Sequence, residues 1–180
     1  MRKRYIMESV YYIYIYITLL KLSFHIVRTL VFSIFLYGSE TWTIKAADRA
    51  RIDAFEMWCW RRLLRIPWTA RRTNISVLEE LKLTREQRLS TVCFARILQY
   101  FGHIARREDD NLEKLLITGK VDGKRTRGRS PKRWSSQVTD HLNIPVHQAI
   151  HYAEDRNRWR RLVDELRLRR SHDPHQWGTD

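Results

Sequence analysis

Residues 84–107 read TREQRLSTVCFARILQYFGHIARR, and this stretch decides the fold. Thr84 and Gln87 have the spacing of a capping box, in which each side chain accepts the backbone N–H of the other residue at a helix start. Apolar residues then recur every three or four positions, which places them on one side of a helix. That side holds Leu89, Val92, Cys93, Ile97, Tyr100, Phe101 and Ile104. The pattern predicts one long helix over residues 85–107.

A second apolar stripe lies upstream and predicts a helix over residues 48–66. Asp48 is the expected N-cap, and Pro67 is expected to stop the helix. Trp58 and Trp60 flank the stripe and are expected to widen its buried face. The stripe itself consists of Ile52, Phe55, Cys59, Leu63 and Ile66.

Shorter periodic segments follow the same logic. A helix over 74–82 is capped by Thr73 or Asn74, and a helix over 111–118 ends at Gly119. Three further helices are predicted. The first has Pro131 in its first turn and Trp134, Val138 and Leu142 on one side. The second is capped by Asn143 and runs to Tyr152, and the third covers residues 154–169. The fold class predicted is all-α, an irregular domain of about six helices after residue 41.

The charge is the first indication of function. Among 180 residues, 34 are Lys or Arg and 20 are Asp or Glu, so the net charge is +14. An excess of this size repels itself, which indicates an anionic partner, nucleic acid first and an anionic membrane surface second. A hydrophobic share of 43% excludes wholesale disorder. Six glycines and four prolines are too few for a collagen-like chain or a turn-rich β-sandwich.

The strongest concentration of positive charge is a loop over residues 120–133, KVDGKRTRGRSPKR, which has no apolar period. Seven bases and one acid give it a charge of +6 in 14 residues. Guanidinium groups bind phosphate oxygens in pairs, and glycine lets backbone N–H groups approach them. A tryptophan follows that could stack on a base, although its helical spacing also fits a core residue. The predicted nucleic-acid-binding residues are Lys120, Lys124, Arg125, Arg127, Arg129, Lys132, Arg133 and Trp134.

The last predicted helix carries further bases that could extend this site. They are Arg156, Arg160, Arg161, Arg167 and Arg170. Acidic residues in the same helix dilute them, namely Glu154, Asp155, Asp164 and Glu165.

Few residues elsewhere suggest catalysis. Asp109 and Asp110 form an acidic pair, but a polymerase needs such a pair on a tight turn between hydrophobic strands, and this pair lies in polar sequence at a helix end. A solvated turn is the preferred interpretation. Cys59 and Cys93 lie within apolar stripes and are expected in the core. Neither a phosphate-binding loop nor a nucleophile elbow occurs in the sequence.

Two pairs of histidines have spacings that a metal site could use. His147 and His151 are four residues apart on one predicted helix, and His172 and His175 are three apart near the C-terminus. Neither pair has a third ligand of matching spacing. We expect surface histidines and no metal site.

The N-terminal segment differs from the rest of the chain. Residues 10–20, VYYIYIYITLL, and 30–37 are strongly apolar, and the basic residues Lys21 and Arg28 lie between them. Neither apolar run reaches the roughly 20 residues of a membrane span. A signal peptide is disfavoured because the core is tyrosine-rich and no small-residue cleavage site follows. The preferred interpretation is a displaced leader, expected to be helical because no strand partner lies nearby, with membrane insertion as the alternative.

Several segments, taken in order, resemble one family. They are HIVRTLVFSIFLYGSETW (25–42), IDAFEMWCWRRLLRIPW (52–68), LQYFGHIAR (98–106), GKVDGKRTRGRSPKRW (119–134) and DRNRWRRLV (155–163). Together they are similar to the region just after the polymerase core of non-LTR (LINE-type) retrotransposon endonuclease–reverse transcriptases. The resemblance covers residues 25–165. Its most specific part is the series LYGSETW, FEMWCWRR, YFGHIAR, GKxxGKRxRGR and DRxxWRxLV.

The resemblance implies a thumb-like region that grips RNA or DNA with little sequence preference. It implies no catalysis by this chain, because the family's aromatic-x-Asp-Asp palm motif has no match and its endonuclease lies further upstream. No cofactor is expected, since Mg²⁺ would serve only those missing polymerase and endonuclease domains. The expected division is a non-family apolar leader at 1–24, a thumb-like helical region at 25–119, the basic loop at 120–133, a C-terminal helical region at 134–170 and a disordered tail at 171–180.

Other interpretations stay open at this point. Residues 74–106 could form a helix-turn-helix in a stand-alone DNA-binding protein. Residues 5–37 could anchor a basic protein to a membrane, and a decayed reading frame would have no function. The expected localisation is nuclear or cytoplasmic, with membrane association as the alternative. Without a palm to lean on, the apolar residues of 25–42 are expected to lie partly exposed.

Overall fold

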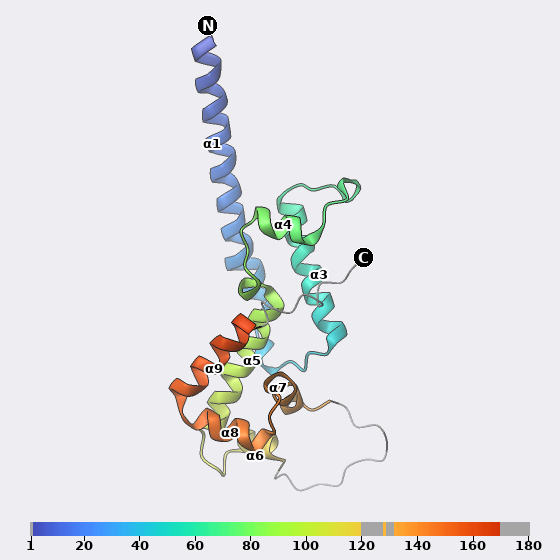
Figure 1. Cartoon of the computed structure of the whole chain (residues 1–180), viewed down its shortest axis with the longest axis vertical. Coiled ribbons are helices and arrows are strands. Elements are labelled where there is room, and N and C mark those ends of the chain that lie inside the picture. The colour runs from blue at the N-terminus through green and yellow to red at the C-terminus, as the bar shows by residue number, and fades with distance from the viewer. Residues whose placement is uncertain (1, 120–127, 129–131, 170–180) are drawn as a thin grey trace. The chain divides into compact units, whose positions relative to one another are not determined.

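The computed structural model describes residues 2–119, 128 and 132–169, and every regular element among them is helical (Figure 1). The predicted all-α fold is confirmed. Seven α-helices follow residue 41 in this part of the chain, where about six were expected. The elements are α1 (Arg2–Ile26), η1 (Val27–Val31), α2 (Phe32–Phe35), η2 (Ser39–Thr41), α3 (Ala46–Leu63), η3 (Trp68–Ala70), α4 (Asn74–Glu80), η4 (Arg85–Gln87), α5 (Leu89–Ala105), α6 (Leu112–Thr118), α7 (Trp134–Leu142), α8 (Val146–Glu154) and α9 (Arg156–Arg169).

The helices form two compact units. Unit 1 comprises Met1–Tyr37 and Asp53–Leu83, and unit 2 comprises Gly38–Ile52 and Thr84–Asp180. These two units are defined by contacts between residues, whereas the predicted domain limits rest on resemblance to a family. The two units therefore do not test the predicted limits, which stay predictions.

Unit 1 is organised around the indole of Trp60. The ring is 1% exposed, stacks on Phe24 at a centroid distance of 4.9 Å and meets Phe32 edge-on at 5.2 Å. Its Nε1 donates to Glu56 Oε1 over 3.3 Å. Aromatic pairs in these geometries add stability beyond the burial of their surface. The leader is therefore a helix, as predicted, and its C-terminal part packs against α3 through aromatic rings.

Trp58 corrects one prediction. Trp60 is buried as expected, but Trp58 is 59% exposed, so only one of the two tryptophans widens the buried face. Successive helical positions are turned by about 100°, and residues two apart therefore cannot both face the core. Arg62 instead lies over the Trp58 ring at 5.8 Å.

Both ends of α3 differ from the prediction. The helix begins at Ala46, and Asp48 lies in its first turn, where its Oδ2 accepts the backbone N–H of Lys45 over 3.2 Å. This is the reciprocal half of a capping box and not an N-cap. The helix ends at Leu63 and not at residue 66, because Arg65 adopts the left-handed conformation (φ 53°) and Ile66 N donates to Arg61 O.

The prediction for α4 is confirmed at its start. Thr73 is the N-cap and its side chain accepts from Ser76 N over 3.2 Å. The helix ends earlier than expected, at Glu80, because Lys82 takes a left-handed conformation (φ 53°) that closes the last turn.

Helix α5 is the centre of unit 2. Twelve of its 17 residues are buried, and the other five form one open stripe along the helix, namely Val92, Arg96, Gln99, Tyr100 and His103. The predicted apolar face is therefore only part of the buried surface. The predicted start at residue 85 is wrong, because Arg88 has an extended backbone (φ −62°, ψ 139°) that separates the short turn η4 from α5.

Helix α9 lies beside α5 (Figure 1), and one glycine sets how closely they approach. A Cβ built on Gly102 would overlap the indole Nε1 and Cδ1 of Trp159. The same Nε1 donates to the carbonyl oxygen of Leu98 over 2.9 Å, and Trp159 is 3% exposed. The ring of Trp159 also lies 5.5 Å from that of Phe101. A side chain larger than hydrogen at position 102 has no room.

Helix α7 holds the chain before α3 through one buried amide. Gln137 is 1% exposed, its Nε2 donates to Trp42 O over 2.7 Å and its Oε1 accepts from Ile44 N over 3.0 Å. Trp134 adds a third bond, from its Nε1 to Glu40 O over 3.0 Å. Backbone groups that have no helical partner are thus satisfied by side chains from a helix some 90 residues away in the chain.

The remaining helix ends test the predicted caps. Gly119 ends α6 in the left-handed conformation, as predicted, and Asn111, for which no role was predicted, caps α6 by accepting from Glu113 N. Asn143 does not begin α8. It ends α7 with a left-handed conformation (φ 54°), and Pro145 precedes α8.

The fold predicts that Gly102→Ala weakens unit 2. The added methyl group overlaps the Trp159 indole, so α9 must shift, at a cost of about 1–3 kcal/mol in the free energy of unfolding. Urea denaturation followed by circular dichroism measures this cost. Gln99→Ala on the exposed side of the same helix is the control and should change stability by less than about 0.5 kcal/mol. Equal stability of the two variants would contradict the close approach of α5 and α9.

Candidate nucleic-acid interface

Most of the predicted basic loop lies outside the described residues. Lys120, Lys124, Arg125, Arg127 and Arg129 are all in this part, so their role stays a prediction. The tail over 171–180 and the histidines within it also lie outside the described residues.

The described end of the loop leads directly into α7. Lys132 Nζ forms an ion pair with Asp140 Oδ2 at 2.7 Å. Arg133 is exposed at the N-cap position of α7 and lines a pocket together with residues of α6, α7 and α8. Both residues are therefore at the surface, and Lys132 already has an acidic partner.

The structure places Trp134 within the packing of unit 2. The ring is half-buried, meets Tyr100 edge-on at 5.9 Å and stacks near Phe101 at 6.2 Å. With its N–H bound to Glu40 O, the indole has the contacts of a core residue. Its predicted stacking on a base stays a prediction.

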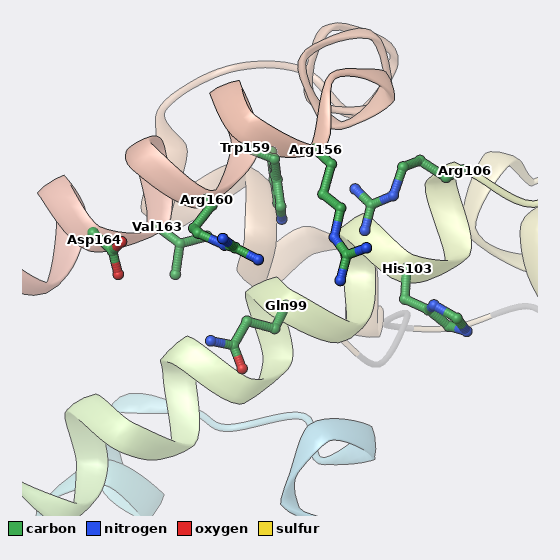
Figure 2. Close-up of a pocket in the computed structure, with 8 residues that line it drawn as sticks. All are labelled: Gln99, His103, Arg106, Arg156, Trp159, Arg160, Val163 and Asp164. Atoms are coloured by element: carbon green, nitrogen blue, oxygen red, sulfur yellow. The ribbon is translucent and has the colours of Figure 1, made fainter.

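A cationic groove lies between α5 and α9 (Figure 2), and sequence reasoning did not assemble it. Its volume is about 320 Å³. Arginines from both helices point into it, and Trp159 and Val163 form its apolar floor. The lining residues are Gln99, His103, Arg106, Arg156, Trp159, Arg160, Val163 and Asp164. We refer to this site as the arginine groove.

Local structure fixes the arginines at the mouth of the groove. Arg106 follows the last residue of α5, and its Nη1 donates to Ala153 O over 2.8 Å. Asp155 caps α9 by accepting from the backbone N–H groups of Asn157 (2.8 Å) and Arg158 (3.1 Å). These two bonds lower the pKa of Asp155, the Arg158 bond more than the Asn157 bond. The cap keeps the first turn of α9 intact.

The electrostatics of the groove are those of an anion site. Burial lowers the pKa of Arg106, and the nearby positive charge of Arg156 lowers it further. Neither Arg156 nor Arg160 has a hydrogen-bond or ion-pair partner among the described residues. The one carboxylate in the lining, Asp164, lies 3.9 Å from Arg167 and points away from Arg156.

The signal that could have found the groove is distributed over two motifs. The sequence identified Arg156 and Arg160 as part of a basic helix face, but it gave no reason to join them to Arg106 or His103. Gly102 is the residue that connects the two helices, and a glycine inside a helical pattern with a packing role is a recognised indication of close approach.

The other candidate residues have structural surroundings. Cys59 and Cys93 are both buried thiols, as expected, and burial followed by the charge of Glu56 raises the pKa of Cys59. Asp109 and Asp110 are exposed in a turn, and Asp109 pairs with Lys114 at 2.8 Å. This bears out the solvated-turn interpretation.

Histidines give no metal centre in the part of the chain that is described. His147 and His151 are exposed on α8, and His151 Nδ1 lies 3.0 Å from Glu154 Oε2. No group of three or more His, Cys, Asp or Glu side chains is arranged to hold a metal ion within the described residues.

Comparison with known proteins gives one informative relative. Over 121 residues, or 66% of this chain, the sequence is 30% identical to an uncharacterized transposon-derived protein of Caenorhabditis elegans. The chain spans 43% of the length of that relative. No protein-family model matches the chain, and no solved structure matches it. The likeness points to a transposon origin.

Proposed function

We propose that this chain is a nucleic-acid-binding part of a non-LTR retrotransposon reverse transcriptase, corresponding to the thumb-like region after the polymerase core. It would hold template RNA or target DNA without catalysing a reaction itself. The observation that carries the proposal is the positive charge of residues 120–133, +6 in 14 residues, on a chain of net charge +14. Such a segment neutralises backbone phosphates and releases their counterions.

Two further observations support the proposal. The five family-like segments occur in the family's order, and the C. elegans relative is described as transposon-derived. Exposed arginines of unit 2, such as Arg106, Arg156 and Arg160, suit binding to backbone phosphates, which carries no sequence information.

The proposal predicts steep salt dependence. A fluorescence-anisotropy titration of the full chain against single-stranded RNA, an RNA–DNA hybrid and duplex DNA should give a log–log slope of up to about −5 for RNA if all seven loop bases contact phosphates. Changing those seven bases to serine should flatten the slope. A control variant with seven lysines and arginines outside 120–133 changed to serine should retain more of the salt slope. No binding to any of the three at low salt would contradict the proposal and favour a decayed reading frame.

The helix-turn-helix alternative receives less support. A recognition helix must present several side chains to the DNA major groove. Helix α5 exposes only Gln99 and His103 among its own residues. Sequence-specific footprints on DNA would favour this alternative all the same, since the proposed function expects sequence-tolerant binding.

Membrane association is a second candidate, and one observation favours it. Within the described residues, Tyr14–Phe35 forms a helical stretch of 22 residues with a mean hydropathy of 1.6, long and apolar enough to cross a membrane by length and composition. Only 6% of that stretch is buried. Large side chains such as Leu30, Ile34 and Tyr37 are exposed, as expected for 25–42. Lys21 and Arg28 oppose insertion, at about 2.5–3.5 kcal/mol each at the bilayer centre.

Membrane pelleting separates this candidate from the first. If the helix inserts, the full chain should remain in the membrane pellet after carbonate extraction, and Leu30→Asp with Ile34→Asp should release it. The matched control is Glu79→Gln with Glu80→Gln on α4. Release of the unmodified chain by carbonate would exclude a membrane-spanning helix. The exposed apolar side chains of residues 14–35 would then need another explanation.

A further inference from the structure

Unit 2 contains a cationic site whose lining residues all lie outside residues 120–133 of the sequence. The arginine groove is lined by donors from α5 and α9, with guanidinium groups from Arg106, Arg156 and Arg160, an imidazole from His103 and an amide from Gln99. All five of these residues are exposed, so a polymer can reach them. The indole N–H of the buried floor residue Trp159 already donates to Leu98 O. The groove therefore offers hydrogen-bond donors at its walls and an apolar floor.

The fold holds these positive charges together without neutralising them. Arg106 is fixed by its bond to Ala153 O, and Arg156 lies close enough to affect its protonation. Figure 2 shows the guanidinium groups of Arg106 and Arg156 directed toward the same side of the groove. Like charges this close repel each other unless an anion lies between them. The helix start itself supplies no free donor at Asn157 or Arg158, because Asp155 already occupies both N–H groups.

The shape of the site favours a phosphate that is part of a chain. A volume of about 320 Å³ exceeds what one phosphate ion needs and leaves room for an attached sugar. Guanidinium groups bind phosphate oxygens in pairs and carry no sequence information when they do so. The indole of the lining presents no exposed face to a base, since Trp159 is 3% exposed. A groove of this kind binds backbone and not base.

We infer that the arginine groove binds a backbone phosphate of RNA or DNA, with Arg106, Arg156 and Arg160 as its ligands, as a second contact beyond the 120–133 loop. The inference rests on the proposed function, because it takes nucleic acid as the source of the phosphate. A free phosphate ion shares the same chemistry and is the other source that the experiment must separate.

The test replaces two groove arginines that have no hydrogen-bond or ion-pair partner among the described residues. The variant Arg156→Gln with Arg160→Gln is compared with Arg51→Gln with Arg161→Gln, which removes the same charge from exposed positions of unit 2 outside the groove. Circular dichroism should be unchanged for both, since none of the four side chains is buried. Single-stranded RNA binding is measured by anisotropy across salt concentrations with the full chain.

The groove variant should flatten the salt slope by up to about 0.7, which corresponds to the loss of the one phosphate contact on a single strand. Its deficit relative to the unmodified chain should therefore grow by up to about 2.6-fold when salt is lowered from about 200 to 50 mM. The control variant should lose much less. If both variants lose the same amount while the unmodified chain binds RNA, the groove is no site and the proposed function stands.

Inorganic phosphate and RNA distinguish the remaining outcomes. If the unmodified chain binds no nucleic acid at low salt, the proposed function and this inference both fail. Isothermal titration with inorganic phosphate then shows whether the groove is a free-anion site, because binding that the Arg156→Gln, Arg160→Gln variant loses would assign the ion to the groove and overturn nucleic acid as its ligand.

Discussion

The contact between Trp159 and Gly102 is the constraint on which unit 2 depends. The missing Cβ at residue 102 lets the indole lie against the backbone of α5, and the indole N–H then binds Leu98 O. This contact fixes the distance and the rotation of α9 on the central helix. The arginine groove is a consequence, because Arg156 lies about one turn before Trp159 and Arg160 directly follows it, so the same contact brings both arginines to the side of α5. Packing and charge placement are thus determined together.

The segments that resemble the retrotransposon family contact one another through residues of their motifs. YFGHIAR and DRxxWRxLV supply the two sides of the Gly102–Trp159 contact, and Asp155 of the second motif caps its helix. LYGSETW and the tryptophan that closes the basic segment meet through the bond from Trp134 Nε1 to Glu40 O. The apolar and capping residues of these motifs hold the helices together, whereas their arginines, Arg106, Arg156 and Arg160, face solvent. Structural contacts of this kind explain the packing of unit 2 and do not by themselves indicate an activity.

Helical periodicity was sufficient to predict that the helices exist, and their ends were harder. Asp48 and Asn143 were both expected to begin helices, yet Asp48 lies inside α3 and Asn143 ends α7. Asp and Asn are favoured at helix N-caps, and both also tolerate the left-handed conformation that ends a helix. Tertiary contacts therefore decide which of these positions such a residue takes. The buried surface of α5 is larger than the predicted apolar face, because amphipathic reasoning assumes one partner and this helix contacts α6, α7, α8 and α9. The groove could not be predicted from the sequence, because it depends on the contact between residues 102 and 159, and no local sequence pattern indicates that contact.

The most direct test of the central claim, that the exposed arginines of unit 2 hold nucleic acid, is arginine footprinting with phenylglyoxal, read by mass spectrometry with and without single-stranded RNA. RNA should protect Arg156 and Arg160, together with the arginines of 120–133, while Arg51, whose side chain is 81% exposed and paired with Asp48, stays reactive. Uniform protection of all exposed arginines would mean non-specific coating of a basic protein. An unchanged modification pattern in the presence of RNA would contradict nucleic-acid binding by this chain.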